Sequence, residues 1–257
     1  MKKNKNLELF KKNGFLKISI FSKKDINFFR EKIIRDLNNK LKNQIECRTK
    51  IKKLENYHDE NINEDHHKFL VNPDRRYINF TSKDVKKVNK KILNLFQHEW
   101  GHNKIALSWI GDLKKKQKKI NYVGYRIARP IKKNKIKKND VAGVHIDMNI
   151  GGIINSDKKS SATIWVPIIG FDKKYTLRIS PSSHLKNHGK KFIKEKKITP
   201  ILPKNYYNKF NFIRLNFKPG EAMVFHPNLL HGGSQNTGTK TRVSLDVRVL
   251  NLKKFKY

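Results

Sequence analysis

Residues 219–250, "PGEAMVFHPNLLHGGSQNTGTKTRVSLDVRVL", contain the pattern that decides the fold. Two β-type runs, at 221–227 and 241–250, lie on either side of a stretch rich in Gly, Asn and Thr, as expected for strands joined by a polar loop. His231 stands between the runs and is followed by two glycines, which let the backbone pass close to another group. The segment therefore predicts a β-sheet with a histidine beside a tight turn.

The last of these runs carries an arginine with two possible roles. Arg242 lies 11 residues after His231, and Ser244 shares its face because alternate residues of a strand point the same way. A buried unpaired charge is costly, and a planar guanidinium suits a carboxylate held by two hydrogen bonds. The other reading is a solvated arginine on the outer face, which is the commoner fate of this residue. Arg248 shares the face by parity and stays open as the carboxylate partner.

A second stretch, "GVHIDMN" at 143–149, places His145 and Asp147 two residues apart. On a strand the two side chains project together. Taken alone, His-x-Asp arises often by chance and a loop histidine is the simpler reading. Together with His231 the pair gives two histidines and one carboxylate, a set that suits non-haem Fe(II) with three open positions. A closed zinc site would want a fourth ligand, usually cysteine, and Cys47 is the only cysteine.

The chain changes character near residue 104. Before it, the run 21–41 has Ser22 and Asp25 at capping-box positions, and 82–100 carries an apolar stripe, so both are predicted helices. After it, short runs rich in Ile, Val and aromatic residues alternate with Gly, Pro, Asn and Lys-rich turns. This order predicts a β-dominated α+β fold, with N-terminal helices packed on one face of a β-sandwich or barrel. We expect a single domain over 1–257, with a helical support region at 1–103 and a β core at 104–252.

The formal net charge of +38 over 257 residues has two explanations. It fits an anionic partner such as nucleic acid, a membrane surface or a phosphorylated substrate. The lysines are scattered along the whole chain, however, and Asn, Ile and Phe are also abundant, so a bias toward A/T-rich codons explains the composition without a function. RNP-like aromatic motifs are not evident. We therefore expect no specific nucleic-acid partner.

Composition also bears on location. No apolar run approaches the roughly 18–20 residues of a membrane span, and the N-terminus lacks the apolar region of a signal peptide. Cys47 alone makes an intrachain disulfide impossible, which fits a reducing compartment. We expect a cytoplasmic protein with no membrane partner, and the sequence does not predict its oligomeric state.

The segment 120–250 resembles the phytanoyl-CoA dioxygenase superfamily of Fe(II)/2-oxoglutarate oxygenases. The matching pieces, in order, are "YRIARP", "HID", "IWVPI", "LRISPSSH" and "PGEAMVFHPNLLHGGSQN" followed by "TR". The family's P-G-S-H element reads Pro181-Ser182-Ser183-His184 here, and the serine in place of glycine puts the local turn in doubt but not the metal ligands. The resemblance implies a double-stranded β-helix core of the jelly-roll or cupin type.

The resemblance also implies roles for seven residues. His145, Asp147 and His231 would bind Fe(II), Arg242 and Ser244 would hold the distal carboxylate of 2-oxoglutarate, and Tyr125 and Trp165 would contact the co-substrate. For Tyr125 and Trp165, ordinary core packing is the competing reading. His226 is expected to flank the site without binding the metal.

The implied activity is that of a 2-oxoglutarate-dependent dioxygenase that uses O₂ to hydroxylate a small metabolite or sugar-type biosynthetic intermediate. Related halogenating enzymes replace the carboxylate ligand with a small residue, so Asp147 favours hydroxylation. The lysines at 132–138 precede His145 and, if functional, predict an anionic small-molecule substrate.

Two alternatives stay open on the sequence alone. A basic nucleic-acid-binding β-domain is supported only by the charge. A cupin-like metal protein without 2-oxoglutarate chemistry would leave Arg242 without a purpose.

Overall fold

The computed structural model describes residues 5–43, 49–60, 62–71, 77–79, 81–100, 106–109, 122–131, 140–147, 162–188 and 201–250. The helices are α1 (Lys5–Asn13), α2 (Lys23–Lys42), α3 (Glu64–Val71), α4 (Ser82–Trp100) and α6 (Lys204–Tyr207), with 3₁₀ turns η1 (Leu54–Asn56) and η4 (Ser183–Leu185). The strands are β1 (Phe15–Ser19), β2 (Tyr77–Asn79), β3 (Ala106–Trp109), β4 (Tyr122–Ala128), β5 (Val144–His145), β6 (Ala162–Ile169), β7 (Arg178–Ile179), β8 (Ile213–Arg214), β9 (Glu221–Phe225), β10 (His231–Gly232) and β11 (Arg242–Leu250). The lysines at 132–138 lie outside the described residues.

Helix α2 begins where the sequence predicts. The Ser22 side chain accepts a hydrogen bond from the Asp25 backbone N–H at 3.2 Å, and the Asp25 carboxylate accepts one from the Ser22 backbone N–H at 2.8 Å, which confirms the capping box. One face of the helix is buried, as its 3.6-residue periodicity requires. The buried residues of this face are Ile26, Phe29, Ile33, Leu37 and Leu41. Among the described residues, every helix is too short or too polar to span a membrane.

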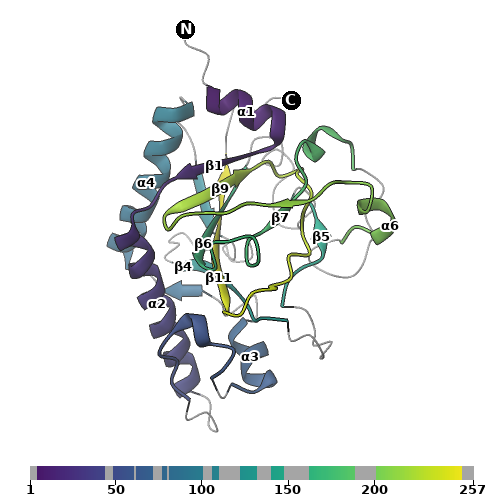
Figure 1. The fold of residues 1–257 in the computed structure, drawn as a ribbon. Coiled ribbons are helices and arrows are strands. Elements are labelled where there is room, and N and C mark those ends of the chain that lie inside the picture. Colours follow the sequence, from purple (N-terminus) through teal and green to yellow (C-terminus); the bar gives the residue numbers. More distant parts are fainter. Residues whose placement is uncertain are drawn as a thin grey trace.

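The described strands form two antiparallel sheets. The larger sheet has the order β1-β9-β6-β11-β4-β2, with β3 paired to β11 beside β4. The smaller sheet has the order β5-β10-β7-β8. Helices α2 and α4 run along one face of the larger sheet, and β5 and β7 lie on the other side of it (Figure 1). The helical first half and the β-rich second half thus pack as the sequence predicts.

Strand β11 shows how the larger sheet separates the core from the space between the sheets. Its residues alternate between polar and apolar, so the two sets point to opposite faces. The apolar residues Val243, Leu245, Val247 and Val249 join the main core beneath the helices. The polar residues Arg242, Ser244, Asp246 and Arg248 face the other way and are nevertheless buried. Buried polar groups need partners, so this face is where a site is expected.

Candidate metal centre

Three buried side chains meet between the two sheets. His145 ends β5, His231 begins β10, and the two are cross-strand neighbours in the smaller sheet, while Asp147 follows β5 by two residues. The Asp147 Oδ1 atom lies 3.5 Å from His231 Nε2 and 3.9 Å from His145 Nε2. One ligand atom from each residue lies within 4.8 Å of the others. These are separations that a single ion can bridge at metal–ligand bond lengths of about 2 Å.

Hydrogen bonds on the far side of each imidazole orient it toward this point. His145 Nδ1 lies 2.7 Å from the Gly143 carbonyl oxygen, and His231 Nδ1 lies 2.9 Å from the Leu229 carbonyl oxygen. A carbonyl only accepts, so each Nδ1 carries the proton and each Nε2 presents a lone pair. Burial, followed by the neighbouring His231, lowers the pKa of His145 to about 3. His145 is therefore a neutral ligand at neutral pH.

The third ligand is held as a carboxylate. Burial alone would raise the pKa of Asp147, but the charge of Arg248 and the hydrogen bond from its guanidinium outweigh it and lower this pKa well below its usual value. Thr163 Oγ1 donates to Asp147 Oδ2 at 2.6 Å, and Arg248 Nη1 donates to the same oxygen. Two neutral imidazoles and one carboxylate match the donor set of a facial-triad iron site, so these residues fit Fe(II).

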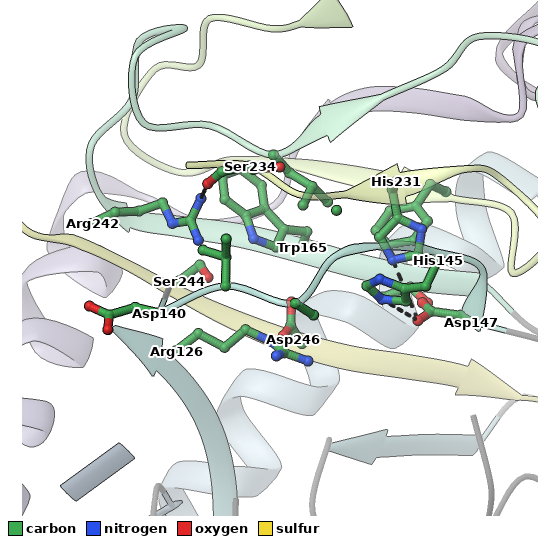
Figure 2. Close-up of a pocket in the computed structure, with 16 residues that line it drawn as sticks. Arg126, Asp140, His145, Asp147, Trp165, His231, Ser234, Arg242, Ser244 and Asp246 are labelled. Atoms are coloured by element: carbon green, nitrogen blue, oxygen red, sulfur yellow. Dashed lines mark hydrogen bonds and ion pairs between the residues drawn. The ribbon is translucent and has the colours of Figure 1, made fainter. Parts of the chain in front are cut away.

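Figure 2 shows the rest of the pocket that begins at this triad. Arg242 and Ser234 lie at the opposite end, with Trp165 between them and the metal ligands. The lining of this one pocket includes both the metal triad and Arg242. A small molecule bound in it can therefore contact the arginine at one end and the metal at the other.

Arg242 is buried, with 5% of its surface exposed, and it is incompletely satisfied. Its Nη1 donates to the Ser234 and Tyr175 carbonyl oxygens at 2.9 and 3.1 Å, but its Nε has no hydrogen-bond partner among the described residues. The Ser244 hydroxyl, on the same face of β11, is likewise without one. Burial, then the neighbouring Arg214 and Arg126, lowers the pKa of Arg242 to about 10, which leaves it charged at neutral pH.

The other charged side chains described in the pocket form ion pairs, and Arg242 does not. Arg126 pairs with Asp246, and Arg248 pairs with Asp147. Asp140 at the pocket edge pairs with Arg129. Among the described lining residues, Arg242 is the charged group that has no ion-pair partner. A buried cation without a counter-charge is costly, so the pocket is built to receive an anion at this end.

Tyr125 lies elsewhere, which corrects the expectation that it contacts the co-substrate. Alternation along β4 turns Arg126 into the pocket and Tyr125 to the other face, where it belongs to the main core. Its hydroxyl donates to Asp36 on α2 at 2.9 Å, and Lys40 lies 5.5 Å above its ring. The competing reading, core packing, is therefore the one that the geometry favours.

The sequence alone did not predict several other pocket residues, among them four with polar side chains. Thr163, Arg126, Asp246 and Asp140 all line the pocket. Strand parity already carried part of the signal, because Thr163 lies two residues before Trp165, and Asp246 lies two residues after Ser244. Asp140 gave no such signal, because it lies in an irregular segment.

A polar network fixes the segment that leads to His145. Both carboxylate oxygens of Asp140 accept from the Arg129 guanidinium, at 2.8 and 2.9 Å. Arg129 Nη1 also donates to Glu64 at the start of α3, and His67 Nε2 lies 3.2 Å from Asp140. Glu64 and His67 of α3 thus serve as structural support, and the segment that carries His145 is tied to the helical half.

Two other histidines of this region, His226 and His184, are not part of the metal-binding triad. His226 packs against His184 with ring centroids 5.1 Å apart, and its Nδ1 accepts from the Asn228 backbone N–H. His184 Nε2 lies 2.8 Å from the Lys11 carbonyl oxygen. Neither belongs to the triad, which agrees with the expectation that His226 flanks the site.

A family model described as phytanoyl-CoA dioxygenase matches residues 10–244. No curated protein sequence matches the chain. Among solved structures, EvdO2 from Micromonospora carbonacea var. aurantiaca gives a TM-score of 0.60 at 11% identity, covering 98% of this chain and 91% of that one.

Other solved structures give TM-scores of 0.54, and two of them have descriptions that name their chemistry or their ligands. One is SnoK, described as a non-heme alpha ketoglutarate dependent carbocyclase from nogalamycin biosynthesis, at 10% identity over 97% of this chain and 84% of that one. The other is EctD from S. alaskensis with 2-oxoglutarate and 5-hydroxyectoine, at 12% identity over 96% and 75%. Identities this low establish the fold alone, and they confirm the predicted double-stranded β-helix.

Proposed function

The chain belongs to the phytanoyl-CoA dioxygenase family, and on that premise we propose that it is an Fe(II)- and 2-oxoglutarate-dependent dioxygenase that hydroxylates a small metabolite or a sugar-type biosynthetic intermediate. The predicted cofactors, Fe(II) and 2-oxoglutarate, are confirmed by the family and by the buried triad. The observation that carries the proposal is the presence, in one pocket, of a facial metal triad and an unneutralised buried arginine.

Each end of the pocket has a separate task. His145, Asp147 and His231 hold the metal ion. Arg242, through its unpartnered Nε, and Ser244, through its unpartnered hydroxyl, bind the distal carboxylate of 2-oxoglutarate. Trp165 lies between the two ends and forms a wall against which the co-substrate chain packs. A charge-assisted hydrogen bond formed away from bulk water is stronger than one in water. The buried arginine therefore both anchors and orients the co-substrate.

When bound, Fe(II) with O₂ supplies an oxidation in which 2-oxoglutarate becomes succinate and CO₂ while one oxygen atom enters a substrate C–H bond. The protein's own contribution is positioning and exclusion of water. Asp147 occupies the carboxylate position, which supports hydroxylation rather than halogenation. SnoK, a carbocyclase, shares the fold, so the oxidative outcome is part of the proposal and not of the family assignment.

The test is turnover of 2-oxoglutarate by the iron-loaded protein under air, measured as succinate. We expect succinate formation that requires both Fe(II) and O₂ and that rises with one member of a panel of small metabolites. The His231→Ala variant should form none. A wild-type protein that neither binds nor converts 2-oxoglutarate would contradict the proposal.

An anionic substrate also stays a proposal. It depends on the lysines at 132–138, which lie outside the described residues. Replacing them with glutamine should weaken the apparent affinity for the substrate, seen as a higher KM, and should leave the apparent affinity for the co-substrate unchanged. An unchanged substrate KM would remove the idea.

A further inference from the structure

The buried Arg248 contacts Asp147, the proposed carboxylate ligand, through the oxygen that does not face the two histidines. Arg248 lies on β11 with 2% of its surface exposed, and its Nη1 donates to both Asp147 Oδ2 and Thr163 Oγ1. Thr163 in turn donates to Asp147 Oδ2 at 2.6 Å. Register explains the meeting, because Arg248 and Thr163 are direct neighbours across the β11–β6 pair. The three side chains form a closed set in which one carboxylate oxygen receives two donors.

The two oxygens of Asp147 therefore have different tasks. Oδ2 is engaged by Arg248 and Thr163, while Oδ1 faces the Nε2 atoms of the two histidines at 3.5 and 3.9 Å. The two lone-pair sites of Oδ2 are taken by these two donors, so a carboxylate that bound the metal through both oxygens would have to give up at least one of them. If Arg248 were the displaced donor, a buried charge would lose its hydrogen-bonded partner, at a large cost in free energy.

We propose that Arg248 is a positioning residue that, with Thr163, restricts Asp147 to one-oxygen ligation and so keeps a coordination position open on the iron. The inference rests on the proposed function, because it concerns the same metal site. A two-oxygen Asp147 would occupy one of the three positions that a facial triad leaves for co-substrate and O₂. Groups behind metal ligands that orient them commonly alter metal affinity by about 10–100-fold.

The chain offers a matched control for Arg248. Arg242 lies on the same strand and the same face, and it is also buried. It makes no ion pair with Asp147 and lies at the far end of the pocket (Figure 2). Arg248→Met and Arg242→Met therefore remove equal side-chain charge from one strand, but only the first removes a contact to a metal ligand.

The experiment is a Co(II) titration of the intact chain without 2-oxoglutarate. We expect Arg248→Met to weaken Co(II) binding by about 10–100-fold, Arg248→Lys to recover part of the loss, and Arg242→Met to stay within about twofold of the wild type. Infrared difference spectra of the Co(II)-loaded proteins report the ligation mode. The separation of the two carboxylate stretching bands should be wide in the wild type and narrower in Arg248→Met.

The outcomes separate the inference from the proposed function. A folded Arg248→Met that binds Co(II) like the wild type, with unchanged carboxylate bands, overturns the inference and leaves the function standing. A wild type that binds no Co(II) at the triad overturns both. If Arg248→Met does not fold, Thr163→Val decides, because it removes one donor to Oδ2 and keeps the side-chain shape. A several-fold weaker affinity with narrowed bands supports the inference, and unchanged values overturn it.

Discussion

At the scale of single residues, Arg242 carries the clearest consequence. Its buried guanidinium lacks a counter-charge among the described residues and keeps an Nε donor unused. Hydrogen bonds to charged groups contribute about 1.5–3 kcal/mol. Arg242→Met should therefore weaken 2-oxoglutarate binding by roughly 10–150-fold, from about 1.4 kcal/mol per tenfold, while metal affinity stays unchanged.

Anaerobic calorimetry of 2-oxoglutarate binding to Mn(II)-loaded protein measures this directly. Leu245→Ala, on the opposite face of β11, serves as a control for damage to the strand. Equal 2-oxoglutarate affinity in Arg242→Met and the wild type would mean that another group anchors the distal carboxylate.

Strand parity explains how much of the site the sequence could predict. It placed Ser244 with Arg242, and it left Arg248 open as the carboxylate partner because a period of two does not say which neighbouring strand a residue meets. The register of β11 with β6 settles this, since it brings Arg248 to Thr163 and Asp147. The face of Tyr125 was beyond reach for the same reason. Only the pairing of β4 with β11 fixes which of its residues meets the pocket.

At the scale of elements, a glycine in β10 allows the close approach of the segments that carry His231 and His145. Gly232 has a φ of +96°, and a Cβ built on it would lie 2.4 Å from the Gly143 carbonyl oxygen and 2.8 Å from His145 Nδ1. The Gly143 oxygen is the group that orients His145. The two glycines after His231 thus allow the close approach that the sequence predicts.

Gly232→Ala should push His145 away from its carbonyl partner and weaken Co(II) binding by roughly tenfold or more. Gly233→Ala is the milder comparison, because its Cβ would meet the movable end of the Arg178 side chain. Equilibrium titration of both variants checks the order. A Gly232→Ala protein that binds the metal as tightly as Gly233→Ala would contradict this account of β10.

The turn at Pro181–His184 shows what the serine in the glycine position does. Ser182 adopts a φ of 59°, the left-handed conformation that glycine enters without strain. Its hydroxyl donates to the Lys12 carbonyl oxygen at 3.0 Å, and its backbone N–H donates to the Asn13 carbonyl oxygen at 2.8 Å. The turn survives the substitution, and it is tied to the end of α1.

Ser182→Gly should unfold at a higher urea concentration than Ser182→Ala, with a difference of about 1 kcal/mol in the free energy of unfolding. Both variants lose the hydroxyl, but only alanine keeps the Cβ that the left-handed region disfavours. Urea unfolding of both variants measures the difference. Equal stability would show that the backbone at 182 relaxes out of this conformation.

Among the helices, those encoded by local sequence patterns were predictable, and the one held by tertiary contacts was not. The ends of α2 and α4 were predictable because a capping box and an apolar stripe are encoded within the segment itself. Helix α3 was not predictable, because its part of the sequence is polar. What holds it is the non-local network in which Glu64 and His67 meet Arg129 and Asp140.

At the scale of the whole molecule, buried histidines make stability depend on pH. Burial lowers the pKa of both His145 and His226 to about 3, with His231 and His184 respectively as further causes. In the unfolded chain both titrate near a pKa of about 6.5. Between these values the unfolded state binds more protons, so stability is fully present above about pH 6.5 and is lost as pH falls toward about 3.

We therefore expect the urea midpoint of the metal-free protein to fall as pH drops from about 6.5 to about 4.5, with a slope of up to about 1.4 kcal/mol per pH unit for each histidine. Asp140 and Asp147 add little in this window, because carboxylates with lowered pKa values lose their contribution only below about pH 4. His226→Gln should show a shallower fall. A variant with the wild-type slope would mean that His226 does not contribute.

We propose that the triad holds Fe(II) while Arg242 anchors 2-oxoglutarate on the same ion. Anaerobic addition of Fe(II) and 2-oxoglutarate tests both halves at once, through the weak visible charge-transfer band that arises only when the keto acid chelates the iron. We predict the band in the wild type, its loss in His145→Ala and Asp147→Ala, and a much higher half-saturating 2-oxoglutarate concentration in Arg242→Met. A wild-type protein without the band, or a His145→Ala protein that retains it, would contradict the account.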